Sequence, residues 1–135
     1  VLRYDVKGRE LLKTGGKYYI ADVGMLNYLD SYRGTDTGCV LENLVFNQLL
    51  FDGYDVLIGH LRGGEVDFVA TKPRCKMYIQ VTENMQDEET QRRELASLRR
   101  IGDEYRKIVV VGEGSYPSDI DGIEIVSIID FLLHR

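Results

Sequence analysis

Three short segments with the composition of β-strands follow one another between residues 55 and 82, joined by tight turns. Asp55–Leu61 and Val66–Ala70 flank Arg62-Gly63-Gly64-Glu65, a sequence typical of a hairpin turn. Cys75–Thr82 follows after a second turn, Thr71-Lys72-Pro73-Arg74. Because such short turns leave no room for a crossover, these strands are predicted to pair as hairpins, and the other elements must fit around them.

One helix is predicted on each side of this three-strand unit. The helix before it runs from about Cys39 to Phe51, stops at Gly53, and is apolar nearly all round, which indicates that it is buried. The helix after it runs from about Asp87 to Ile101. Its first turn is acidic and its last turn is basic, as the helix dipole favours.

The remaining elements are predicted at the two ends of the chain. They are a strand over Lys17–Ala21, a helix from Asp22 to about Gly34, strands over Lys107–Val111 and Ile123–Val126, and a closing helix over Ile128–Leu133. Hairpins followed by a helical crossover to a further strand imply a mixed sheet. The sequence therefore predicts an α/β fold with a mixed central sheet and helices flanking both faces.

Length and composition limit the kinds of protein this can be. The 135 residues include 22 acidic and 17 basic side chains, for a net charge of −5. This predicts one globular domain over residues 1–135 and excludes a collagen, a disordered tail and a disulfide-stapled miniature. No apolar run approaches the ~20 residues that span a bilayer, so no membrane partner is expected. The acidic balance also argues against a surface dominated by phosphate binding.

Cysteine and histidine are too isolated to suggest a zinc site. Cys39, Cys75, His60 and His134 have no partners at the short paired spacing that zinc ligands show. Two unpaired thiols fit a reducing compartment, which predicts a cytoplasmic location. The chain opens on Val1 with no charged-then-apolar leader, and we expect it to begin partway into a longer protein.

Gly16-Lys17 is similar to the end of a phosphate-binding loop, but the rest of that pattern is missing. The loop needs an earlier glycine at the position that Leu11 holds here, and it follows a strand rather than preceding one. Gly15-Gly16 is therefore predicted to be a turn. No nucleotide site is expected in this chain.

Four polar residues form the candidate site. Gln80 and Thr82 share one face of the strand Cys75–Thr82 because side chains alternate along a strand. Placing the neighbouring strands side by side brings Asp67 close to Gln80. Glu42 is the carboxylate of the apolar helix, where it needs a partner or a polar pocket because desolvating a lone charge is costly.

Five segments, together with these residues, carry a family resemblance. The set resembles the PD-(D/E)xK nuclease superfamily, whose restriction-endonuclease-like core has the order α-β-β-β-α-β. A more specific resemblance is to a domain of unknown function that lies C-terminal to AAA+-type ATPase modules in bacterial and archaeal chains, and it covers nearly the whole chain. The segments are Lys17-Tyr18-Tyr19-Ile20-Ala21-Asp22-Val23-Gly24, Gly64-Glu65-Val66-Asp67-Phe68-Val69, Tyr78-Ile79-Gln80-Val81-Thr82, Glu88-Glu89-Thr90-Gln91-Arg92-Arg93-Glu94-Leu95 and Lys107-Ile108-Val109-Val110-Val111.

The resemblance implies a divalent-metal site with altered ligands. Glu42, Asp67 and Gln80 would line a site for Mg²⁺ or Mn²⁺, which prefer hard oxygen ligands. Thr82 stands where an active nuclease has Lys, and Gln80 offers a carbonyl oxygen without charge. Lys72 or Lys76 would have to reach back from the neighbouring turn to supply the missing cation. Both departures weaken catalysis, because no cation orients the attacking water or stabilises the phosphorane.

Structural roles compete with these functional ones. Asp67 can complete a hairpin turn, Glu42 can pair within the fold, and Gln80 and Thr82 can be ordinary polar residues on a half-buried strand. The basic residues Arg92, Arg93, Arg99, Arg100, Arg106 and Lys107 alternate with acidic ones, which is typical of a solvated helix rather than a nucleic-acid face.

The sequence leaves three functions open. The first is a catalytically weak or inactive nuclease-like C-terminal module that contacts the AAA+-type ATPase module of its own chain or another partner. The second is a metal-dependent nuclease with an altered site. The third is nucleic-acid binding without cleavage, which the charge of −5 makes the least favoured.

Overall fold

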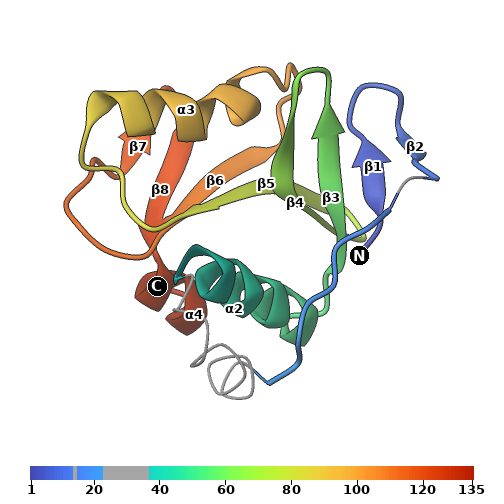
Figure 1. The fold of residues 1–135 in the computed structure, drawn as a ribbon, viewed down its shortest axis with the longest axis horizontal. Coiled ribbons are helices and arrows are strands. Elements are labelled where there is room, and N and C mark those ends of the chain that lie inside the picture. Colours follow the sequence, from blue (N-terminus) through green and yellow to red (C-terminus); the bar gives the residue numbers. More distant parts are fainter. Residues whose placement is uncertain (14, 23–36) are drawn as a thin grey trace.

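A computed structural model describes residues 1–13, 15–22 and 37–135 (Figure 1). One mixed eight-stranded sheet forms its centre, in the order β2-β1-β3-β4-β5-β6-β8-β7. The strands are β1 (Arg3–Asp5), β2 (Glu10–Leu11), β3 (Asp55–Leu61), β4 (Gly64–Lys72), β5 (Cys75–Thr82), β6 (Arg106–Val111), β7 (Asp119–Ile120) and β8 (Ile123–Ser127). The described helices are α2 (Thr37–Phe51), α3 (Glu88–Arg99) and α4 (Ile128–Leu133).

The predicted fold class is confirmed. Strands β3, β4 and β5 pair as antiparallel hairpins, and β5, β6 and β8 then pair in parallel. Strand β1 joins the other side of the sheet, parallel to β3. The order α2-β3-β4-β5-α3-β6 is the predicted core order, and β3 and β5 have the predicted bounds. The short strands β1, β2 and β7 were not predicted from the sequence.

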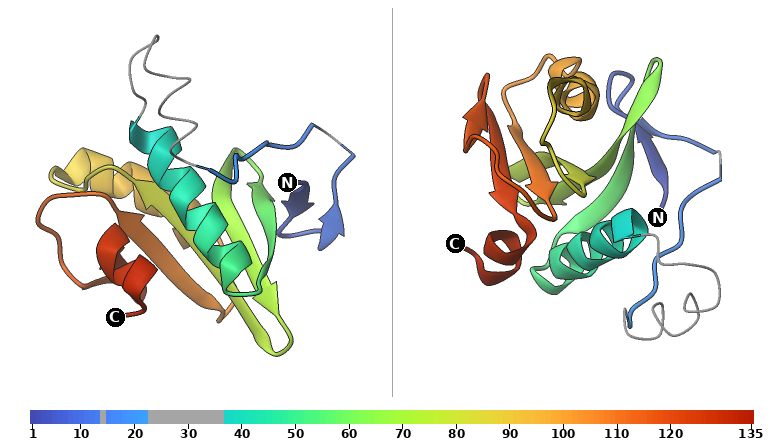
Figure 2. Two further views of the ribbon diagram at one scale, coloured as in Figure 1. Left: turned by 90° about the horizontal axis from the view of Figure 1, so that it is seen from below. Right: turned by 60° about the vertical axis from the view of Figure 1, so that its left-hand side comes forward.

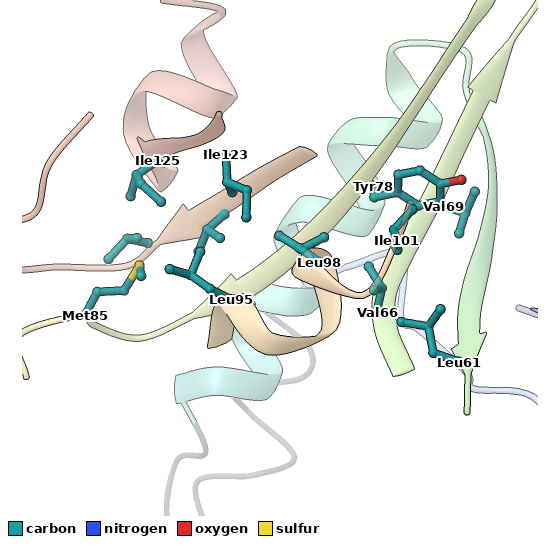
Figure 3. Packing of buried hydrophobic residues seen from close by; sticks show 12 residues of the cluster. Leu61, Val66, Val69, Tyr78, Met85, Leu95, Leu98, Ile101, Ile123 and Ile125 are labelled. Atoms are coloured by element: carbon teal, nitrogen blue, oxygen red, sulfur yellow. The ribbon is translucent and has the colours of Figure 1, made fainter. Parts of the chain in front are cut away.

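Helices cover both faces of the sheet. Helix α3 lies on one face, and α2 and α4 lie on the other (Figures 1 and 2). Under α3, Leu95 and Leu98 pack with Tyr78 and Val66 in one hydrophobic cluster (Figure 3). On the other face, Val45 and Leu49 of α2 belong to a second cluster. The sheet therefore separates two cores, and β4 and β5 contribute to both.

Helix α2 is not buried all round, which corrects the prediction from its composition. Asn43, Val45 and Leu49 are its buried residues. Leu50 and Phe51 follow directly but keep 49% and 85% of their surface exposed. Apolar residues on every side of this helix therefore exceed what one sheet face can cover.

The predicted strand over Lys17–Ala21 is wrong. This segment has no strand partner, and the side chains of α2 bind its backbone instead. The Asn43 amide accepts from the Ile20 N–H at 2.9 Å and donates to the Ile20 carbonyl at 2.7 Å. Tyr19 stacks on Phe46, with ring centroids 4.4 Å apart. β-type composition therefore marked an extended segment that packs on a helix. The helix predicted from Asp22 to about Gly34 lies outside the described residues.

A search of the described helices finds none long and apolar enough to cross a membrane.

The division of α2 predicts unequal effects of two adjacent substitutions. Leu49→Ala removes a fully buried side chain, so the free energy of unfolding should fall by about 2–5 kcal/mol. Leu50→Ala is the matched control and should cost about 1 kcal/mol or less, because that side chain is half exposed. Urea denaturation of the two variants measures the difference, and equal losses would contradict the placement of α2.

Candidate carboxylate site

Asp67 lies at an irregularity in strand β4. Leu57 of β3 is opposite Val69, but Gly59 is opposite Val66, so β4 carries one extra residue between these pairs. A Cβ on Gly59 would lie 3.0 Å from the Val69 side chain, so glycine suits the close approach of the strands here. The register between β4 and β5 also ends next to Asp67, at the pair Phe68 and Ile79. An extra residue of this kind re-aims a side chain and ends regular pairing.

Side chains replace the backbone pairing beyond that point. The Val81 N–H donates to Asp67 Oδ2 at 2.9 Å, and the Asp67 N–H donates to Gln80 Oε1 at 3.2 Å. The structure thus brings Asp67 and Gln80 together, as the alignment of their strands indicated. Both side chains satisfy backbone N–H groups that would otherwise lack a partner in the ladder.

Gln80 also contacts a carboxylate that the sequence reasoning missed. Its Nε2 donates to Glu94 Oε2 at 3.3 Å, which links β5 to helix α3. Glu94 is 14% exposed, and its other oxygen faces Arg93 at 3.4 Å. The signal for Glu94 was weak, because it stands among alternating charges on a helix that was predicted to be solvated.

Glu42 lies beneath the segment that precedes α2. Its Oε1 accepts from Lys17 Nζ at 3.2 Å and from the Tyr19 hydroxyl. Lys17 Nζ also lies 3.3 Å from Glu65 Oε1, and Arg3 Nε lies 3.2 Å from Glu65 Oε2. Two carboxylates therefore share one lysine.

Lys17 is the cation that the sequence reasoning missed. Burial alone would lower the pKa of its amine, but Glu42, Asp67 and Glu65 together raise that pKa. The two turn lysines proposed from the sequence lie elsewhere: Lys72 Nζ is 4.1 Å from the Tyr54 ring, and Lys76 Nζ lies among tyrosine rings. From the sequence, Lys17 was considered only as part of a predicted strand and of an incomplete phosphate-loop pattern. A Cβ on Gly16 would meet the Val1 carbonyl oxygen at 2.2 Å, so Gly16 allows the chain to pass close to Val1.

Asp67 has the most perturbed carboxyl in the site. Burial raises its pKa to about 7, with Glu42 and Glu94 adding to the rise. The Val81 N–H and Lys17 act in the opposite direction but do not cancel it. Near neutral pH the Asp67 carboxyl therefore exchanges between its protonated and ionised forms, and a nearby cation would favour the ionised form.

Thr82 serves the turn after β5. It is buried, and its hydroxyl donates to the Asn84 carbonyl at 3.1 Å. Thr82 therefore belongs to the buried end of β5 and its turn.

The predicted metal ligands Glu42, Asp67 and Gln80 are all engaged by other groups of the protein. Across residues 1–13, 15–22 and 37–135, no three His, Cys, Asp or Glu side chains group in a way that could hold a metal ion. Gln80 would have to supply the third ligand, but its carbonyl oxygen already accepts the Asp67 N–H. What the arrangement does offer is a proton-holding carboxyl beside a lysine with a raised pKa.

The chain is similar to a longer bacterial protein. The chain is 37% identical over 131 residues to an uncharacterized protein of Haemophilus influenzae. The aligned region covers 97% of this chain but 32% of that protein, so the chain spans about a third of its relative's length. No family model matches the chain. No solved structure matches it either.

Asp67 should give the free energy of unfolding a pH dependence. Its pKa is about 7 in the folded chain, against an ordinary value of 3.8. Between these values the folded chain binds more protons than the unfolded chain, so the free energy of unfolding falls as pH rises from about 4 to 7. Asp67→Asn should flatten this part of the profile, measured by urea denaturation across the window.

Glu65→Gln is the matched control. Burial alone would raise the pKa of Glu65, but hydrogen bonds and charges from Arg3 and Lys17 lower it below 4.5. Its stabilising contribution is therefore present at neutral pH and lost only in acid. In Glu65→Gln, the free energy of unfolding should still decline as pH rises toward 7. A decline that also persists in Asp67→Asn would show that another group causes it.

Proposed function

We propose that this chain is a non-catalytic or weakly catalytic nuclease-like module of a longer protein. The module is the C-terminal domain of an AAA+-type ATPase and works by contact with the ATPase module, as a regulatory or interaction domain. Two findings support the parent chain. Four of the five segments that carry the resemblance lie in the adjacent strands β4, β5 and β6 and in helix α3, and the Haemophilus influenzae relative is about three times as long as the aligned region.

The hydrogen bonds of Gln80 carry the proposal. An active nuclease of this kind places a second acid on this strand, where it would bind metal. Here an uncharged amide accepts from the Asp67 N–H and donates to Glu94. An acid at position 80 would lose the second bond and face the Glu94 carboxylate directly. The present residue therefore stabilises the strands and is not available for chemistry.

The other predicted site residues have similar internal roles. Glu42 accepts from Lys17 and Tyr19, Asp67 accepts from the Val81 N–H, and Thr82 donates to the turn. Groups already engaged in the fold must break those bonds before they can bind a metal or a phosphate, and each broken buried bond costs about 1–3 kcal/mol. This supports an interaction role over an enzymatic one.

One observation favours a second candidate, a divalent-metal-dependent nuclease with an altered site. Lys17 forms an ion pair with Glu42, and the charges of Glu42 and Asp67 raise the pKa of its amine. Lys17 therefore places a cation beside the carboxylates, where Thr82 supplies none. In this candidate, Mg²⁺ or Mn²⁺ would displace the Asp67 proton and Lys17 would stabilise charge on the phosphate.

Cleavage assays separate the two candidates. The 135-residue chain is incubated with millimolar Mg²⁺ or Mn²⁺ and labelled single-stranded DNA, duplex DNA or RNA, beside Asp67→Asn. We expect no cleavage above the Asp67→Asn background, and no heat of Mn²⁺ binding by titration calorimetry. Cleavage by the wild-type chain that Asp67→Asn and Lys17→Ala both abolish would overturn the proposal and establish the nuclease.

A further inference from the structure

A cleft of about 650 Å³ opens on the face of the sheet that α3 covers, away from the pair Lys17 and Glu42. It lies between the β1–β2 hairpin, the β3–β4 turn and the chain that follows α3, which come together at one end of the molecule (Figures 1 and 2). Five basic side chains from these segments and β5 line it: Lys7, Arg9, Arg62, Lys76 and Arg100. In a chain with a net charge of −5, this is a strong local excess of positive charge.

Among the described residues, the cations of the cleft form no ion pairs, unlike several other basic residues. Arg3, Lys17, Arg99 and Arg106 each form an ion pair with a carboxylate. For the five cleft residues, no ion pair occurs within the described part of the chain. One of them forms a side-chain hydrogen bond instead: Arg100 Nη1 donates to the Gly63 carbonyl at 3.2 Å.

One acidic side chain lies in the described cleft lining. Asp103 accepts from the Tyr78 hydroxyl at 2.5 Å and lies 3.7 Å from Lys107 Nζ. Its ion pair is therefore with a lysine outside the five cations, and the described lining holds five basic side chains against one acidic one. Unpaired cations that converge on one cleft repel one another, and an anion relieves that repulsion.

Aromatic rings stand beside these charges. Lys76 Nζ lies 5.1 Å from the centre of the Tyr105 ring and 5.3 Å from those of Tyr4 and Tyr78. Tyr105 also lines the cleft and is 50% exposed. An exposed ring next to phosphate-binding cations is the combination on which bases of a single strand stack.

We propose that this cleft binds single-stranded nucleic acid, with the backbone phosphates on the cations and a base on Tyr105. The cations come from four separate segments, which suits several successive phosphates better than one. A mononucleotide site would be expected at a helix N-terminus with a glycine-rich loop. This cleft receives the C-terminal end of α3, whose dipole disfavours an anion, so side-chain charge must supply the attraction. The inference does not depend on the state of the carboxylate site.

Fluorescence anisotropy tests the proposal on the 135-residue chain, without added metal. The probe is a fluorescein-labelled oligothymidylate of about 12 nucleotides, a length within the range that single-strand sites cover. Binding should weaken steeply between about 50 and 200 mM salt. Lys7→Ala combined with Arg62→Ala should weaken binding about tenfold or more and reduce the salt slope by about one per lost phosphate contact.

Matched variants separate the cleft from general charge. Arg92→Ala combined with Arg135→Ala removes the same charge from exposed residues outside the cleft lining, and should change affinity less than about twofold. Tyr105→Ala should weaken binding, and Tyr105→Phe should retain it, because the ring and not the hydroxyl stacks.

Three results would overturn the proposal. They are no binding at low salt, equal losses in the two double variants, and equal binding of a duplex of the same length. ADP or pyrophosphate can also be added at a concentration equal to that of the oligonucleotide counted per nucleotide. If either then displaces the oligonucleotide completely, the cleft is assigned to a small phosphate ligand instead.

Discussion

A strand pair that stops pairing leaves backbone N–H groups that must find other partners. Where β4 and β5 separate, the carboxylate of Asp67 and the amide of Gln80 supply those partners. The arrangement around them follows from this exchange. It fixes Asp67 inside the molecule, where burial and the charges of Glu42 and Glu94 raise its pKa, and it turns the remaining Gln80 donor toward α3. A local need of the sheet thereby determines the electrostatics of the site.

The sheet also separates two charged regions that differ in their ion pairing. On the side of α2, Glu42 and Glu65 share Lys17. On the side of α3, five basic residues converge, and none of them forms an ion pair within the described residues. The net charge does not reveal this difference, because −5 is a sum over the whole chain. The acidic composition argued against phosphate binding by the whole surface, but composition carries no information about how charge is distributed within one cleft.

The sequence was most informative where structure depends on neighbours in the chain. Hairpin turns set which of β3, β4 and β5 are neighbours, so the bounds of β3 and β5 and the meeting of Asp67 with Gln80 could be predicted, whereas β4 (Gly64–Lys72) is longer than the predicted Val66–Ala70. Lys17–Ala21 shows the limit of composition, because residues that favour a strand form one only when a partner strand is available. Here Asn43 of α2 takes that place.

Residues that meet only in three dimensions were missed for a different reason. Lys17 and Glu42 lie 25 positions apart, and their contact depends on how the segment before α2 lies against the helix. The cleft gathers Lys7, Arg62 and Arg100 from distant segments, so no sequence window contains them together. The extra residue in β4 leaves no pattern in the sequence. Gly59 of the neighbouring strand is explained only by the structure, where a Cβ at this position would crowd the Val69 side chain.

The attachment of residues 17–21 to α2 has a consequence for how the molecule comes apart. This segment is tied by side-chain amides, stacked rings and a link to Val1, while the ladder from β3 to β8 does not include it. Detaching it leaves the ladder from β3 to β8 intact, so local opening there requires less free energy than global unfolding. Such an opening carries Lys17 and Tyr19 away and leaves Glu42 and Glu65 facing water without their shared counter-charge. The balance of charge on the α2 side can therefore change while the sheet remains folded.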